Sequence, residues 1–268
     1  MNHNEVDEAH RQFVVMWRAF VADHSGSDVS SLPGLDIFWA ESPLRLWNAL
    51  LLSDRTSDAK LLSAVVQRAA DYMRTKSRAG SAWICLEYLG GDAAAELPNI
   101  ISACGLEPAT SLAGMVGEIF PLSIDPNSGL TFARAVDDEA LATFAEVDAD
   151  AFGIAPEDMR AGLFGSGLWK DSAYSLVGYD RSLQAVSVAS VLVSEGQLYL
   201  ALVGTRRACR KLGYAEATVR YALQKAFEAT GLSRTNLHAT AAAAPIYARL
   251  GYHATSTFNA YRLRQPST

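Results

Sequence analysis

An apolar run, a short basic loop and an amphipathic run, in that order, constrain the fold of this 268-residue chain more than any other feature. Residues 197–203 read QLYLALV, residues 206–211 read RRACRK, and residues 215–230 have the apolar spacing of a helix. An almost wholly apolar strand is typical of a strand that is covered on both faces. The order therefore predicts a buried strand that leads through a basic turn into a helix.

The basic loop also has chemistry of its own. The first N–H groups of a helix have no internal partner, and the helix dipole adds partial positive charge there. Gly213 would let an anion approach the backbone. Residues 206–211 carry four basic side chains and no acid, in a chain with a net charge of −6. This stretch alone leaves two interpretations open, a phosphate site and an ordinary turn with a solvated basic rim.

The rest of the second half fits a sheet with flanking helices. Residues 183–193 and 198–203 have the pattern of strands, and the tight turn between them predicts a hairpin. The other elements that we expect are strands at 130–136, 173–179 and 234–240, helices at 137–153, 155–164 and 242–250, and a final extended segment.

Two short motifs follow one another in this frame. The first reads RKLGYA at residues 210–215, and the second reads YARLGY at residues 247–252. Their spacings are Arg-x-x-Gly-x-Ala and Tyr-x-x-x-Gly-Tyr, with a helix and a strand between them. In this order they resemble the two signatures of the GNAT N-acetyltransferase family, over roughly residues 130–268.

The resemblance implies an α/β (α+β) GNAT fold, which is a mixed, mostly antiparallel sheet flanked by helices. It also implies that acetyl-CoA binds between splayed strands and passes its acetyl group directly to an amine, with no metal. Tyr247 would protonate the departing thiolate; the alternative is a core tyrosine. The residues expected to bind acetyl-CoA are Leu202, Val203, Thr205, Arg210, Lys211, Leu212, Gly213, Tyr214 and Ala215.

Some positions depart from the family pattern. Arg207 stands where many members have proline, and the central strand has no carboxylate inside it, only Glu195 at its edge. A catalytically silent acyl-CoA-binding protein is therefore the alternative function. His238 is either a proton relay or an ordinary strand histidine. Residues 129–160 hold eight acids, which would either attract a cationic amine or form a solvated helix face.

The first half has the features of a second, decayed copy. Its pattern predicts helices at 5–23, 57–76 and 92–103, strands at 36–41, 44–52 and 81–89, a loop at 25–34, and extended chain from the third helix to residue 120. Residues 99–119 align with 245–263, which places Ile101 on Tyr247 and Gly105 on Gly251. We therefore expect two GNAT-like domains, 1–128 and 129–268, with the boundary in the loop 121–129. Two unrelated packed layers are the alternative.

Composition narrows the class of protein. The negative net charge argues against a nucleic-acid binder, and no apolar run is long enough to span a membrane. Three scattered cysteines suit a reducing compartment, and the charged N-terminus has no signal core. We expect a cytoplasmic monomer or homodimer whose partner is a small-molecule amine or a peptide.

Overall fold

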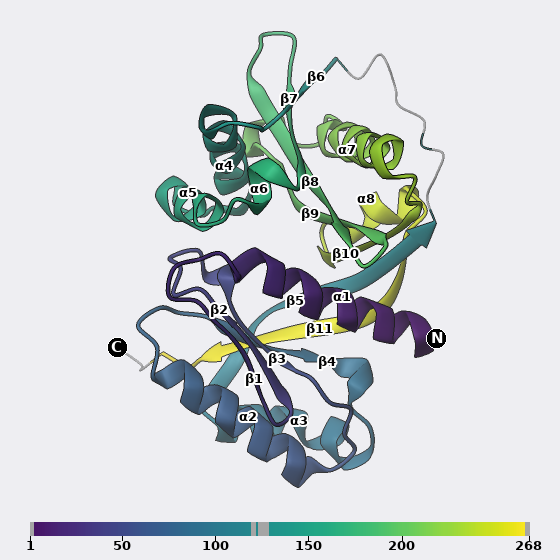
Figure 1. Cartoon of the computed structure of the whole chain (residues 1–268). Helices are drawn as coiled ribbons and strands as arrows, with labels where there is room; N and C mark the ends of the chain where they lie inside the picture. The colour runs from purple at the N-terminus through teal and green to yellow at the C-terminus, as the bar shows by residue number, and fades with distance from the viewer. Residues whose placement is uncertain (1–2, 119–121, 123–128, 266–268) are drawn as a thin grey trace. The chain divides into compact units, whose positions relative to one another are not determined.

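The computed structural model of the chain describes residues 3–118, 122 and 129–265 (Figure 1). The chain divides into two compact units. The first unit consists of Met1–Met115, His238–Ala244 and Ala254–Thr268, and the second consists of Val116–Leu237 and Pro245–His253. Within the described residues, no helix combines the length and the apolar character that a membrane crossing needs.

The first unit contains a mixed sheet with the strand order β1-β2-β3-β4-β11-β5. The pairs β1/β2, β2/β3 and β4/β11 are antiparallel, and β3/β4 is parallel. The strands are β1 (Asp28–Leu32), β2 (Leu35–Trp39), β3 (Asn48–Leu52), β4 (Ser81–Cys85), β5 (Leu106–Glu118) and β11 (His253–Leu263). The helices are α1 (His3–Val21), α2 (Ala59–Arg74) and α3 (Gly91–Ala103), with 3₁₀ turns at Arg45–Trp47 and Leu86–Tyr88.

Helices cover both faces of this sheet. Because side chains alternate along a strand, Ala82 and Ile84 of β4 belong to the core beneath α2 and α3, whereas Trp83 faces the other way. The Trp83 ring lies 5.4 Å from that of Phe13 on α1. Phe13 also stacks on Phe258 of β11, at 5.1 Å. The first unit is therefore a three-layer structure, with α1 on one face and α2 and α3 on the other (Figure 1).

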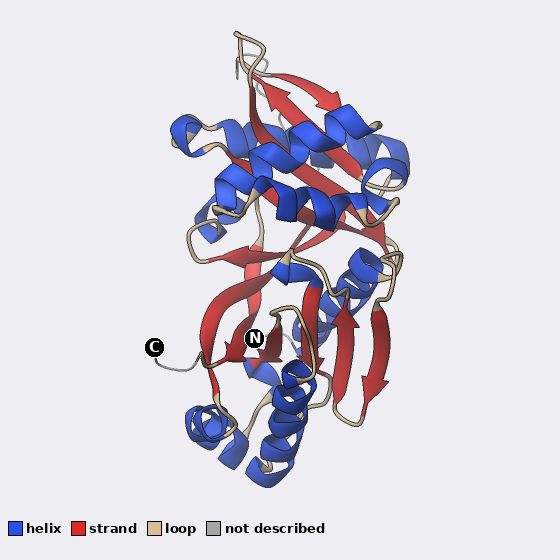
Figure 2. Ribbon diagram, turned by 90° about the vertical axis from the view of Figure 1, so that its left-hand side faces the viewer, coloured by secondary structure: helices blue, strands red, loops and turns tan. Residues whose placement is uncertain are grey.

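The second unit contains the strand order β10-β9-β8-β7-β6, antiparallel except for the parallel pair β9/β10. The strands are β6 (Thr131–Arg134), β7 (Tyr174–Tyr179), β8 (Ala185–Ser194), β9 (Gln197–Thr205) and β10 (Arg234–Thr240). The helices are α4 (Asp138–Phe152), α5 (Pro156–Phe164), α6 (Leu168–Asp171), α7 (Tyr214–Thr230) and α8 (Ala244–Arg249), with a 3₁₀ turn at Arg207–Cys209. The helices α4 and α7 pack on opposite faces of these strands (Figures 1 and 2).

The same succession of elements occurs twice. In the first unit, an antiparallel meander ends in β3, α2 crosses to the parallel strand β4, and α3 leads into β5. The second half of the chain repeats this order with β9, α7, β10, α8 and β11. The expected mixed, mostly antiparallel sheet flanked by helices is confirmed, and so is the expected duplication of the topology.

The division into units differs from the predicted division 1–128 and 129–268. Most of the predicted boundary loop, 121–129, lies outside the described residues. The final strand was expected in the second domain, but Ala254–Thr268 belongs to the first unit, where β11 pairs with β4. The pattern of a buried strand is the same in whichever sheet it pairs, so the sequence could not reveal this exchange.

Four local predictions were wrong. The strand predicted at 81–89 ends at Cys85 and is followed by a 3₁₀ turn at Leu86–Tyr88. The loop predicted at 25–34 contains strand β1, whose mostly exposed polar residues show no apolar alternation. The strand predicted from residue 44 begins with a 3₁₀ turn at Arg45–Trp47. The four-residue helix α6 was not predicted, since it is too short to show a period.

Candidate active site

The strand β9 carries an irregularity where the expected donor-binding residues lie. The register with β8 shifts between Val188 and Ser190, and Leu202 has a φ of +49°. In the described chain, β10 pairs with β9 only at Leu198–Leu200. The second half of β9 is therefore bonded to β8 on one side, and its other backbone edge is available for an extended ligand.

The loop after β9 turns sharply into α7. Lys211 and Gly213 both have left-handed backbone, with φ of +66° and +79°. A Cβ on Gly213 would meet no atom within 4 Å, so the loop is open on that side. Among the described residues no side chain caps α7, and its first backbone bond runs from the Ala217 N–H to the Gly213 carbonyl. The N–H groups at the start of α7 are therefore available to an anion.

The end of α4 holds this loop in place. The Asp150 carboxylate accepts a hydrogen bond from the Arg207 backbone N–H at 2.7 Å. The Arg210 guanidinium donates to the Ala151 carbonyl. The side chain of Arg210 thus bonds to α4, while the neighbouring backbone forms the turn. Two contacts to one helix end favour a loop that is formed before any ligand arrives.

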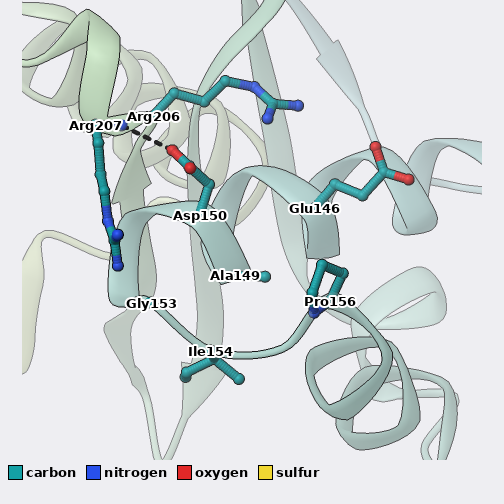
Figure 3. A pocket seen from close by; sticks show the side chains of 8 residues that line it. All are labelled: Glu146, Ala149, Asp150, Gly153, Ile154, Pro156, Arg206 and Arg207. Atoms are coloured by element: carbon teal, nitrogen blue, oxygen red, sulfur yellow. Dashed lines mark hydrogen bonds between the residues drawn. The ribbon is translucent and has the colours of Figure 1, made fainter.

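A cavity of about 490 Å³ lies beside these contacts. Glu146 and Asp150 of α4 line it together with Arg206 and Arg207 (Figure 3). Its floor is the connection between α4 and α5, from Gly153 to Pro156. The walls therefore present charges of both signs next to the loop.

Tyr247 lies on α8 and is buried, with 6% of its surface exposed. Burial raises the pKa of its hydroxyl above the usual value, and the negative charge of Asp148 raises it further. Its ring stands edge-on to that of Tyr252, 6.0 Å away. A buried phenol with a raised pKa keeps its proton at neutral pH, as a proton donor must.

Asp148 is a site residue that sequence reasoning missed. It was counted among the eight acids of 129–160, yet its side chain is 0% exposed. A Cβ on Gly204 of β9 would lie 2.6 Å from Asp148 Oδ1. Neither carboxylate oxygen has a hydrogen-bond partner among the described residues, and burial raises the pKa of Asp148 to about 7. Its spacing after Leu141 and Phe144, on the apolar face of α4, was the signal that could have revealed it.

His238 lies in a different environment. It belongs to the first unit, where its ring packs edge-on against Phe13 at 5.1 Å, Trp17 at 6.0 Å and Phe258 at 4.7 Å. Burial lowers the pKa of His238 to about 3. An aromatic cage and a permanently neutral ring fit the ordinary core histidine rather than the proton relay.

The first unit has no counterpart of the loop at 206–213. There, the carboxylate of Asp58 caps α2 and accepts the N–H groups of Lys60 at 2.7 Å and Leu61 at 3.3 Å. A fixed carboxylate thus occupies the place that an anionic ligand would need. Ile101, which aligns with Tyr247, is 3% exposed within the core of α2 and α3. These features agree with a decayed copy.

The chain is similar to known acetyltransferases in sequence over part of its length and in structure over most of it. A family model described as "Acetyltransferase (GNAT) domain" matches residues 133–260. No curated protein sequence matches the chain. Among solved structures, a GCN5-related N-acetyltransferase from Kribbella flavida is similar, with 17% identity, a TM-score of 0.70 and 96% of each chain covered.

Two further structures show the same likeness. A GCN5-related N-acetyltransferase from Sphaerobacter thermophilus has 17% identity and a TM-score of 0.63, with 87% of this chain and 77% of that chain covered. A tandem GNAT protein from the clavulanic acid biosynthesis pathway has 12% identity and a TM-score of 0.56, with 98% and 97% covered. At these identities the likeness concerns the fold. Residues 133–260 match the GNAT acetyltransferase domain, and the chain has a GNAT-like fold in each of its two units.

Proposed function

We propose that the second unit transfers the acetyl group of acetyl-CoA directly to an amine. The observation that carries this proposal is that, in the described part of the chain, a bulged, half-paired strand leads into a helix whose N-terminus has no side-chain cap. An extended amide chain that ends in a pyrophosphate matches both features, since the first offers backbone partners and the second offers N–H donors. The same segment lies inside the region that matches the GNAT domain.

The donor would be bound mainly by backbone groups. Leu202 and Val203 would pair with the pantetheine arm as a neighbouring strand would, with Thr205 at the end of the same edge. The N–H groups of Lys211–Ala215, which include those of Leu212 and Tyr214, would hold the pyrophosphate. The basic side chains of 206–211 would add attraction that weakens as salt is raised. Arg210 would contribute by fixing the loop to α4.

Tyr247 would supply the proton that the departing thiolate needs. The amine attacks the acetyl carbon and loses a proton to a base, the C–S bond breaks, and the phenolic proton goes to sulfur. The raised pKa of Tyr247 keeps that proton on oxygen until charge develops on sulfur. The unpaired edge of β9, the loop after it and Tyr247 all belong to the second unit.

The acceptor is a small-molecule amine or a peptide. A mass-spectrometric screen of an amine and peptide library with acetyl-CoA and the full chain tests this proposal. We expect at least one acetylated product that is absent without protein. Calorimetry accompanies the screen, because acetyl-CoA binding without transfer to any member would indicate the silent acyl-CoA-binding protein instead.

A further inference from the structure

Asp148 is an unusual carboxylate for a protein interior. It is fully buried on α4, and neither oxygen has a hydrogen-bond partner in the described part of the chain. A buried polar group without a partner lowers the stability of a fold, so most such groups are satisfied or serve a function. Among the described residues Asp148 forms no ion pair, and burial is the cause of its raised pKa.

The position of Asp148 links it to the donor strand. Its Oδ1 atom lies where a side chain on Gly204 would begin, at 2.6 Å from the Cβ position. Gly204 follows the bulge at Leu202, within the part of β9 that β10 leaves unpaired. Because residue 204 lacks a side chain, the carboxylate can lie against the face of β9 in the segment whose edge the acyl donor would occupy.

Among the described residues, the ionisable groups to consider beside Asp148 come from α8, α4, β9 and the loop after β9. The negative charge of Asp148 raises the pKa of Tyr247 on α8. The basic side chains after β9 are directed elsewhere: the Arg206 Nε donates to the Ala185 carbonyl, Arg210 donates to the Ala151 carbonyl, and Arg207 lies over Gly153. On α4 itself, Glu146 and Asp150 line the cavity described above. On β9, Tyr199 is buried, and burial together with the charge of Tyr247 raises its pKa.

We propose that Asp148 is the catalytic base, which accepts the proton that the acceptor amine loses as it attacks the acetyl carbon. The inference rests on the proposed transfer from acetyl-CoA. The nitrogen lone pair forms the C–N bond, and the resulting ammonium proton moves to the Asp148 carboxylate. The C–S bond then breaks, sulfur keeps the electron pair, and the Tyr247 proton neutralises it. The products are an amide and free CoA thiol.

Asp148 and Tyr247 also regain their starting protonation states without a further reactant. After the reaction Asp148 is a neutral acid and Tyr247 is a phenolate, so one proton moves from the carboxyl to the phenolate. This direction is downhill because the phenol has much the higher pKa of the two. A carboxyl with the lower pKa and a phenol with the higher pKa are suited to act as the base and the acid of one reaction.

The test compares the wild type with Asp148→Asn, which keeps the size of the side chain but cannot accept the proton. The matched control is Glu139→Gln, the same chemical change at an exposed position in the first turn of α4. The acceptor is an amine from the library whose nitrogen stays neutral between pH 5 and 9, such as an aromatic amine or a hydrazide. Acetyl-CoA affinity is measured separately by calorimetry.

We expect Asp148→Asn to bind acetyl-CoA as the wild type does and to lose about 10²- to 10⁴-fold in kcat. The wild-type kcat should rise with pH around pH 7, and the variant should lack that rise. A variant kcat within about threefold of wild type would overturn the assignment, since a base contributes far more. If Asp148→Asn does not fold, a wild-type profile that is flat around pH 7 overturns it equally. Absence of transfer by the wild type itself would instead overturn the proposed function.

Discussion

At the scale of single residues, the proposed chemistry rests on two buried ionisable groups of the second unit. Tyr247 and Asp148 come from α8 and α4, far apart in sequence, and the charge of one raises the pKa of the other. Tyr247 could be predicted because it stands in a motif with fixed spacing. Asp148 could not be separated from the other acids of α4, because a helix with many carboxylates usually exposes them.

Asp148 should make the stability of the protein depend on pH. Its folded pKa of about 7 lies above its ordinary value of 3.8, so between these values the folded state holds a proton that the unfolded chain lacks. Protonated Asp148 therefore adds its full contribution to the free energy of unfolding below the unfolded pKa of 3.8. This contribution is lost as pH rises through the folded pKa of about 7. Asp148→Asn should thus be the more stable protein above pH 7, by up to about 4 kcal/mol, and gain little at acid pH.

Urea unfolding of the wild type, Asp148→Asn and Glu139→Gln at several pH values measures this difference. The exposed control should follow the wild type throughout. If the stability of Asp148→Asn changes with pH in parallel with the wild type, Asp148 is not a carboxyl with a raised pKa.

Tyr247→Phe should leave acetyl-CoA affinity largely intact and lower kcat by about 10²- to 10⁴-fold. The phenolic proton is needed only as charge develops on sulfur, so its loss affects turnover rather than donor binding. Steady-state transfer and calorimetry measure the two effects separately. Tyr221→Phe is the control, because the partly exposed Tyr221 ring on α7 stacks on Phe132 and contacts Lys225, and phenylalanine keeps that ring. Turnover of Tyr247→Phe close to that of the control would remove Tyr247 from the mechanism.

At the scale of elements, the loop between β9 and α7 was the most predictable part of the site. Its glycine, its basic residues and the apolar strand before it could all be read from neighbouring positions. The bulge at Leu202 could not, because an extra residue in one strand is defined only by the register of its partner. The edge strand β1 was missed for a related reason, since an exposed strand needs no apolar alternation.

Gly213→Asp should abolish acetyl-CoA binding, and Gly213→Asn should weaken it far less. Both side chains must adopt the left-handed backbone of Gly213, which Asp and Asn tolerate better than most residues. The two variants therefore share the conformational cost and differ in charge. Calorimetry measures affinity, and thermal unfolding checks that both fold. Equal affinities of the two variants would show that no anion lies against this turn.

Ile101→Ala tests the structural role of the matching element in the first unit. The side chain is buried in the core of α2 and α3, so its truncation should lower the free energy of unfolding by about 2–5 kcal/mol. Acetyl-CoA affinity and kcat of the folded variant should not change. Thermal unfolding with calorimetry distinguishes the two effects, and a loss of donor affinity at unchanged stability would contradict a decayed copy.

At the scale of the whole molecule, one topology occurs twice with different helix N-termini. Among the described residues, α7 of the second unit has no side-chain cap after the central strand, whereas Asp58 caps the corresponding helix α2 of the first unit. The sequence indicated the duplication through its pattern of elements and a short alignment. It could not indicate that the last strand pairs in the first unit, because the hydrophobic pattern of a strand does not determine which strand lies beside it.

Calorimetric titration of the full chain with acetyl-CoA tests the central claim most directly. We expect one molecule bound per chain, and no binding by Gly213→Asp. At about 100 times the dissociation constant, the ligand should also raise the free energy of unfolding by about 2.7 kcal/mol. Two molecules per chain would contradict the decayed first unit, and no binding by the wild type would contradict the acetyl-CoA site itself.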